Sequence, residues 1–265
     1  MSEQQHHSPA STGTAPASEP RPWAGAGWAD GPLLGFDTET TGVDPRSDRL
    51  VTAALVSRGP RRPDGGRDQE VLTWLADPGV EIPAGAAAVH GVSTERARAE
   101  GRPVEEVLEE VAARLAAAMA AGTPVVAFNG SFDLTLMESE LARHSLPTLR
   151  ERLGRELGPV LDPLVLDRKV DRYRRGKRRL GDVCAVYGVV VDEALHTAEV
   201  DVAATLDVLE AILRAHPEVA RLGADELVAF QAAAHRDWAV SFNDFLRRKG
   251  RPADVETAWP LPEGL

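Results

Sequence analysis

Acidic residues lie at the ends of predicted structural elements at three separate places in the chain. Asp37 and Glu39 directly follow the apolar run at residues 33–36, and strand alternation places both carboxylates on one face. Asp133 follows a second apolar run, and Asp201 lies in the first turn of a helix with periodic apolar residues. Carboxylates crowded at the ends of buried strands repel one another, and a divalent cation removes that conflict. Because hard oxygen ligands suit Mg²⁺ or Mn²⁺, the pattern favours a site for such ions.

Each of these positions also has an ordinary structural explanation. Asp37 and Glu39 could be solvated acids at a strand end, and Asp133 could complement the dipole of a helix N-terminus. His196, five residues before Asp201, is expected on the loop that enters the last acidic helix. A single His in such a place is usually a surface or capping residue. The functional argument therefore rests on the joint occurrence and order of these sites.

The elements that must position these residues predict an α/β fold, with a mixed sheet of about five strands flanked by helices. Strands are predicted at 33–36, 50–57, 70–75, 124–128 and 160–166. The turn-rich residues 58–69 join the second and third strands as an antiparallel hairpin. Helices are predicted at 103–121, after a capping Ser131, and at 180–187, 198–214 and 217–249.

Composition bounds the class of protein. The 265 residues are 43% apolar, which excludes a wholly disordered chain, and one cysteine excludes a disulfide scaffold or a thiolate metal cluster. No apolar run is long enough to span a membrane, and the start of the chain has no signal-peptide core, so a cytoplasmic protein is expected. Residues 1–30, rich in Ala, Ser, Pro and Gly, are predicted to be a flexible leader, and 216–265 a helical extension with an irregular, Pro-rich end.

Four short motifs occur in a fixed order along the chain. They are FDTETTG at 36–42, AVHGV at 88–92, FNGSFDL at 128–134 and HTAEVD at 196–201. Together they resemble the DEDDh family of 3′–5′ exonucleases, which has a ribonuclease H-like fold and includes the epsilon proofreading subunit of the bacterial replicative polymerase. The family more often has His where Phe128 stands, a position that is not a catalytic ligand. The resemblance covers residues 31–215 and implies that they form an exonuclease domain.

This resemblance implies phosphodiester hydrolysis with two divalent ions, Mg²⁺ or Mn²⁺. Asp37 would bridge the two ions, Glu39 and Asp201 would join it at the ion that carries the attacking water, and Asp133 would support the second ion. His196 would be the general base, since an imidazole pKa near 6.5 suits proton removal at neutral pH. Expected contacts to the terminal nucleotide come from Thr38, Thr40, His90, Asn129 and Phe132, with loop packing as an equal alternative for His90.

A strongly basic segment lies between the second and third acidic motifs. Residues 168–179 hold eight basic residues against one acid, within a chain of formal net charge −11. We predict that Arg174, Arg175 and Lys177 contact substrate phosphates and that Tyr173 stacks on a base. The alternative is a solvated loop or helix face. Asp162, on the last predicted strand, is assigned a structural role.

The sequence therefore predicts a metal-dependent 3′–5′ exonuclease that removes nucleotides from single-stranded 3′ ends, with DNA favoured over RNA. The alternatives are an RNA-trimming exoribonuclease, a catalytically silent nucleic-acid-binding module, and a structural protein whose acids only solvate strand ends. The sequence shows no polymerase domain. A proofreading role would therefore require a DNA polymerase subunit as a partner.

Overall fold

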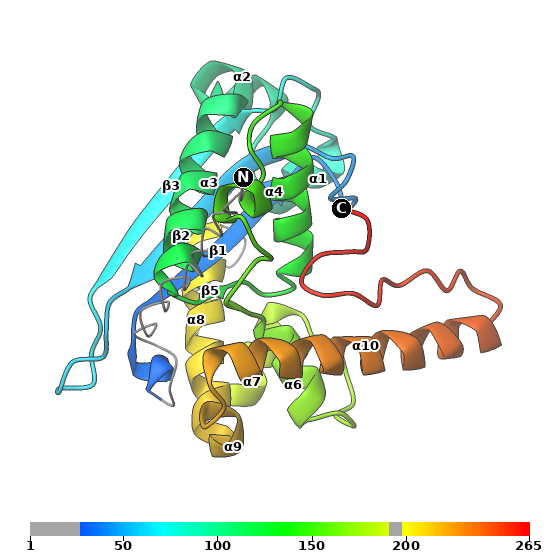
Figure 1. Ribbon diagram of the computed structural model, residues 1–265. Coiled ribbons are helices and arrows are strands. Elements are labelled where there is room, and N and C mark those ends of the chain that lie inside the picture. Colours follow the sequence, from blue (N-terminus) through cyan, green and yellow to red (C-terminus); the bar gives the residue numbers. More distant parts are fainter. Residues whose placement is uncertain (1–26, 191–197) are drawn as a thin grey trace, which may run out of the picture.

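The computed structural model describes residues 27–190 and 198–265 (Figure 1). Within these residues six strands form one mixed sheet, in the order β4-β3-β2-β1-β5-β6. They are β1 (Leu33–Thr40), β2 (Leu50–Arg58), β3 (Gln69–Asp77), β4 (Arg102–Pro103), β5 (Val125–Val126) and β6 (Val160–Leu161). β1 to β3 form an antiparallel meander, whereas β5 runs parallel to β1 and β6 parallel to β5. The predicted mixed sheet is confirmed, with the two-residue β4 as an additional strand.

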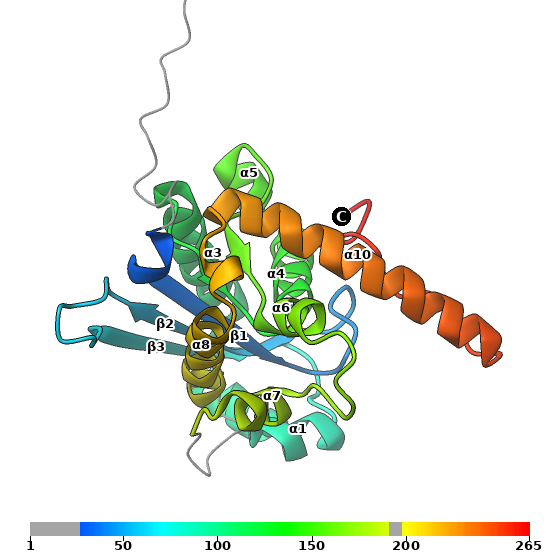
Figure 2. The ribbon, with the colours of Figure 1, turned by 90° about the horizontal axis from the view of Figure 1, so that it is seen from below.

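Helices cover both faces of this sheet (Figures 1 and 2). They are α1 (Ala84–His90), α2 (Thr94–Glu100), α3 (Val104–Ala121), α4 (Ser131–Arg143), α5 (Leu149–Leu153), α6 (Pro163–Val170), α7 (Leu180–Tyr187), α8 (Ala198–Ala215), α9 (Pro217–Ala220) and α10 (Ala224–Arg248). Leu34 and Phe36 of β1 join a core with α3 and α4, while Leu33 joins a second core with α7 and α8. Successive residues of β1 therefore face opposite helical layers. In the described ranges no helix has the length and apolarity to cross a bilayer.

Two local predictions were wrong at element ends. The strand predicted at 160–166 stops at Leu161, because Asp162 caps α6 by accepting a hydrogen bond of 2.9 Å from the Leu164 N–H, and Pro163 occupies the first helical turn. Ser131 does not cap α4: it is the first helical residue, and Gly130 precedes it without a side-chain cap. The short α1 and α2 were not predicted, because they lack a long apolar period.

The predicted leader includes a few residues that the structure describes, and Trp28 among these is packed. Trp28 lies in a short 3₁₀ turn and is 1% exposed. Its indole N–H donates a 2.8 Å hydrogen bond to the Leu222 carbonyl, so this end is tied to the segment before α10. Residues 1–26 of that leader lie outside the described residues.

The C-terminal extension packs on the same body. Gln231 of α10 is fully buried, accepts a 2.7 Å hydrogen bond from the Asp162 N–H and donates to the Val160 carbonyl at 3.1 Å. After α10 the irregular segment turns back toward the sheet, where Trp259 and Leu261 join the core of α3 and α4 (Figure 1). Residues 224–265 are thus anchored by burial and by buried hydrogen bonds.

Gly35 lets α8 approach β1 closely. A Cβ atom built at Gly35 would meet Val202 Cγ1 at 2.4 Å and Leu206 Cδ1 at 2.9 Å. Both contacts are far inside normal packing distance, so only glycine allows this helix to lie so near the strand. The contact adjoins Asp201 on α8 and lies two residues from Asp37 on β1.

Gly35→Ala is expected to destabilise the protein by about 1–3 kcal/mol, because overpacking pushes α8 away from β1. Urea denaturation measures this loss. Gly85→Ala, in α1, is the matched control, since a Cβ there meets nothing within 4 Å and the substitution raises helix propensity. Equal stability of the two variants would contradict the close-packing argument.

Candidate active site

Four carboxylates from three elements act on one another at the end of β1. Asp37 and Glu39 share the face of β1 that packs on α8, whose first turn carries Asp201, and Asp133 lies in the first turn of α4. Burial raises the pKa of Asp37 well above its usual range, and the charges of Asp133, Glu39 and Asp201 raise it further. The structure thus brings the four predicted acids into one electrostatic cluster.

Two further members of the cluster, Glu39 and Asp133, also have raised pKa values, chiefly because of burial. Burial raises the pKa of Glu39 to about 7, with a further contribution from Asp201. The pKa of Asp133 is also raised to about 7, chiefly by burial and despite hydrogen bonds from Thr38 that favour its charged form. Near neutral pH these groups are therefore poised between the protonated and ionised forms, which is typical of functional sites.

Thr38 fixes Asp133 against the central strand. Its backbone N–H and its hydroxyl both donate to Asp133 Oδ1, at 3.0 Å and 2.6 Å, in a buried position. These bonds join β1 to α4 and orient the carboxylate. Thr38, predicted to contact substrate, directs its hydroxyl to Asp133, which makes it a positioning residue in this arrangement.

Asp162 holds the turn that leads into Asp133. Asn129 has a left-handed φ of 62°, a conformation that Asn tolerates better than most residues. The two carboxylate oxygens of Asp162 accept hydrogen bonds of 3.1 Å from the Asn129 and Gly130 N–H groups. Burial raises the pKa of Asp162 to about 6, and these bonds oppose the shift. The structural role predicted for Asp162 agrees with these contacts.

The donor set of the cluster suits a hard divalent cation, because carboxylate oxygens whose repulsion raises their pKa gain most from a positive ion. In residues 27–190 and 198–265, however, no group of three or more His, Cys, Asp or Glu side chains is arranged to hold a metal ion.

A cavity of about 230 Å³ opens beside Glu39 and is lined by His90 at the end of α1. The His90 Nδ1 accepts a 3.2 Å hydrogen bond from the Val92 N–H, and burial lowers its pKa. Arg96 and Glu199 also line this cavity and were missed by the sequence reasoning. Glu199 lies within the HTAEVD motif, which was an available signal, whereas nothing in the sequence singles out Arg96.

The other predicted contact residues lie in different surroundings. Asn129 and Phe132 line a second cavity, and the Thr40 hydroxyl donates to the Gly42 carbonyl at 2.6 Å. Within the basic segment, Arg174 pairs with the buried Asp167 and with Asp171, while Arg175 and Lys177 are exposed. His196 lies outside the described residues.

Comparison with protein families and curated proteins gives consistent matches. The exonuclease family model RNase_T matches residues 34–209. The "DNA polymerase III subunit epsilon-like protein" of Rhodobacter capsulatus is 35% identical over 192 residues, which cover 71% of this chain and 24% of that protein. The "DNA polymerase III PolC-type" protein of Streptococcus thermophilus is 29% identical over 171 residues, which cover 64% of this chain and 10% of that protein. The chain thus spans a quarter or less of these curated relatives.

Solved structures share the fold. Exonuclease I of E. coli, in complex with a dT13 oligonucleotide, has a TM-score of 0.57 at 20% identity, covering 71% of this chain and 42% of that one. Exonuclease X, in complex with 5′ overhanging duplex DNA, has a TM-score of 0.50 at 20% identity, covering 75% of this chain and 99% of that one. The predicted ribonuclease H-like fold is confirmed.

Asp133→Asn is expected to stabilise the metal-free protein at pH 8. The folded pKa of Asp133 is about 7, above the ordinary value near 3.9. The protonated carboxyl therefore favours folding below about pH 4, and this contribution is lost as pH rises through about 7. Asn removes the charge and keeps an acceptor for Thr38. Urea denaturation in EDTA should show a gain of about 1–3 kcal/mol at pH 8 and little change at pH 4.

Asp64→Asn, in the exposed turn between β2 and β3, is the control and should change stability little at either pH. A wild-type protein as stable as Asp133→Asn at pH 8 would contradict the cost assigned to ionising the buried Asp133 carboxyl.

Proposed function

The chain belongs to the RNase_T exonuclease family, and from that premise we propose that it is a metal-dependent 3′–5′ exonuclease acting on single-stranded DNA ends. The observation that carries the proposal is the cluster of Asp37, Glu39, Asp133 and Asp201, in which the other three charges each raise the pKa of Asp37. Such a cluster is costly for the fold and is expected where a site binds cations.

The four acids would hold the divalent ions, Mg²⁺ or Mn²⁺, which when bound supply positive charge for the phosphate and lower the pKa of water. In the hydrolysis, a water oxygen bonds to phosphorus, the P–O3′ bond breaks, and the freed 3′ oxygen takes up a proton. His196 is proposed to accept the proton lost by the water, because an unperturbed imidazole has a pKa suited to proton transfer near neutral pH. Thr38 and Asp162 would keep Asp133 and the preceding turn in place during this step.

The cavity beside Glu39 is a candidate site for the terminal nucleotide. His90, Arg96 and Glu199 line it together with Glu39 and offer polar contacts. A pocket with a small number of polar groups placed beside titratable carboxylates is the usual arrangement of a substrate site.

DNA is the proposed substrate because the relatives named above are DNA polymerase III proteins and the structural neighbours hold DNA. The substrates of those proteins extend to this chain only as a proposal, since the chain spans a small part of the curated relatives. Association with a DNA polymerase subunit likewise stays a prediction.

Degradation of 5′-labelled single-stranded DNA and RNA of one sequence tests the function. With Mn²⁺ or Mg²⁺ we expect a ladder that shortens from the 3′ end, faster on DNA, and no cleavage in EDTA. Asp37→Ala should abolish cleavage, and His196→Ala should lower the rate by about 10²- to 10⁴-fold, the usual contribution of a general base.

Asp64→Ala is the control for charge loss and should cleave like the wild-type protein. Faster degradation of RNA would reassign the substrate, and undiminished cleavage by Asp37→Ala would refute the proposed site. No cleavage by the wild-type protein with either metal would refute the proposed activity.

A further inference from the structure

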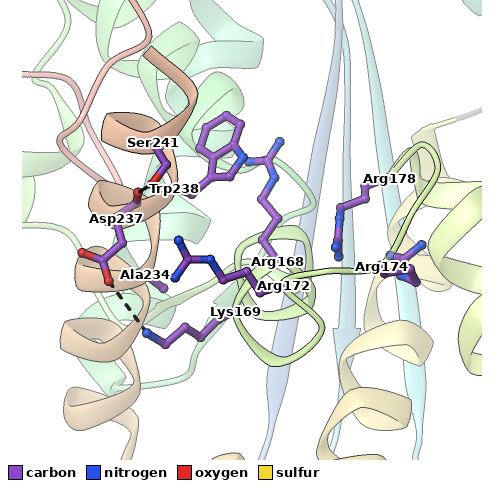
Figure 3. Close-up of a pocket in the computed structure, with 9 residues that line it drawn as sticks. All are labelled: Arg168, Lys169, Arg172, Arg174, Arg178, Ala234, Asp237, Trp238 and Ser241. Atoms are coloured by element: carbon purple, nitrogen blue, oxygen red, sulfur yellow. Dashed lines mark hydrogen bonds and ion pairs between the residues drawn. The ribbon is translucent and has the colours of Figure 1, made fainter. Parts of the chain in front are cut away.

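A groove between α6 and α10 adjoins the acidic cluster. Two cavities, of about 450 and 420 Å³, share Arg168 and Trp238 in their walls. The first also borders Asn129, on the turn before α4, and Phe132, which precedes Asp133 in that helix. The second extends from the shared pair along α6 and α10 (Figure 3). The two cavities therefore form one path that starts beside the cluster.

The second cavity is lined mainly by cations. Arg168, Lys169 and Arg172 project from α6 and the residues after it toward α10 (Figure 3). Asp237 is the carboxylate in this wall, and it lies 3.9 Å from Lys169 Nζ. Arg172 is exposed and makes no ion pair with any described residue, so its charge is available to a ligand.

Two of the carboxylates that line the first cavity already accept hydrogen bonds from nearby residues of the chain. Asp44 accepts hydrogen bonds from the Ser47 hydroxyl and the Arg46 N–H, and Glu256 accepts from two backbone N–H groups that follow it. Asp254 is a further acid in this wall. The basic character of the groove thus belongs to its second half, away from the cluster.

Aromatic rings continue the groove along α10. The ring centroids of Trp238 and Phe242 lie 5.4 Å apart at 14°, and those of Phe242 and Phe245 lie 6.1 Å apart at 13°. The Arg168 guanidinium lies 3.6 Å from the centroid of the Trp238 ring. Phe242 is 36% exposed and Phe245 41%, and Tyr173 on the basic segment is 87% exposed. Exposed stacked rings beside an exposed cation such as Arg172 are unusual on a surface that only meets water.

We propose that this groove binds the single strand on the 5′ side of the cleaved nucleotide, with phosphates at Lys169 and Arg172 and bases stacked on the exposed rings of α10. Cationic and aromatic side chains along one channel match a strand that carries a phosphate and a π-face at every nucleotide. The inference rests on the proposed function, because it takes the acidic cluster as the place of the 3′ end. It assigns to α10 a role in substrate binding.

Fluorescence anisotropy of labelled single-stranded DNA of roughly 20 nucleotides, measured in EDTA, tests binding without cleavage. The double variant Lys169→Ala/Arg172→Ala should weaken DNA binding about tenfold. The slope of log K for binding against log salt concentration should become shallower by about 1.4, the value for two phosphate contacts on a single strand. Phe242→Ala with Phe245→Ala should weaken binding about fivefold or more, from the loss of base stacking.

Two controls match these variants. Arg62→Ala removes a charge from the exposed turn between β2 and β3, and Val240→Ala removes an exposed apolar side chain from α10 two positions from Phe242, on another face of the helix. Both should bind the strand like the wild-type protein. Circular dichroism confirms that each variant is folded.

Hydrolysis of a dinucleotide with Mn²⁺ separates this inference from the proposed function. Groove variants that bind the long strand weakly and cleave the dinucleotide normally support the groove. If the wild-type protein binds the long strand through the groove but cleaves neither the long strand nor the dinucleotide, the groove is supported and the proposed activity is refuted. Groove variants that bind the long strand like the wild-type protein overturn the inference, and this face would then suit a protein partner.

Discussion

Mutual repulsion among carboxylates at the end of β1 is the constraint on which the rest of the structure depends. Burial alone makes ionisation of Asp37 and Asp133 unfavourable, and each neighbouring charge adds to that cost. A fold tolerates such a group only if other interactions hold it in place. The surrounding structure supplies those interactions through short hydrogen bonds and close packing at three elements.

The residues that hold the acids in place are not the ones that would be expected if only the stability of the fold mattered. Thr38 directs two donors to one oxygen of Asp133, and Asp162 is buried in order to hold a left-handed Asn129 and to cap α6. Gly35 gives up side-chain packing in the middle of a central strand so that α8 can lie against it. Each of these residues departs from an ordinary local preference. Gly35 and Thr38 lie within two residues of Asp37, and Asp162 bonds the turn that precedes Asp133. Their common result is the position of the carboxylates.

Much of this arrangement could be predicted from local sequence, and the failures have identifiable causes. The acids were found because alternation in β1 and the order of the motifs are local properties. The end of β6 was misplaced because the apolar run continues into α6, and periodicity alone cannot separate a buried strand from a buried helix. The pairing of Arg174 and Arg178 with buried Asp167 was missed, since a run of charges does not reveal which of its members a core carboxylate will neutralise. His196 lies outside the described residues, so its role stays a prediction.

α10 shows why one periodic pattern can serve two purposes. In its first half Leu227 and Ala234 are buried against the body, and Gln231 fastens the helix to β6. The far end of α10 extends away from the sheet, as Figures 1 and 2 show. In the second half of the helix Ala239, Asn243 and Leu246 are still buried, whereas Phe242 and Phe245 are exposed. Apolar residues at helical spacing predict a buried stripe in both halves, because the pattern carries no information about where the body ends. The difference lies in what covers the helix: the sheet edge in the first half, and in the second the C-terminal segment, where Asn243 bonds the Val255 backbone and leaves Phe242 and Phe245 exposed. The acidic chain thereby concentrates positive charge and aromatic surface on one path, which begins where its buried carboxylates lie.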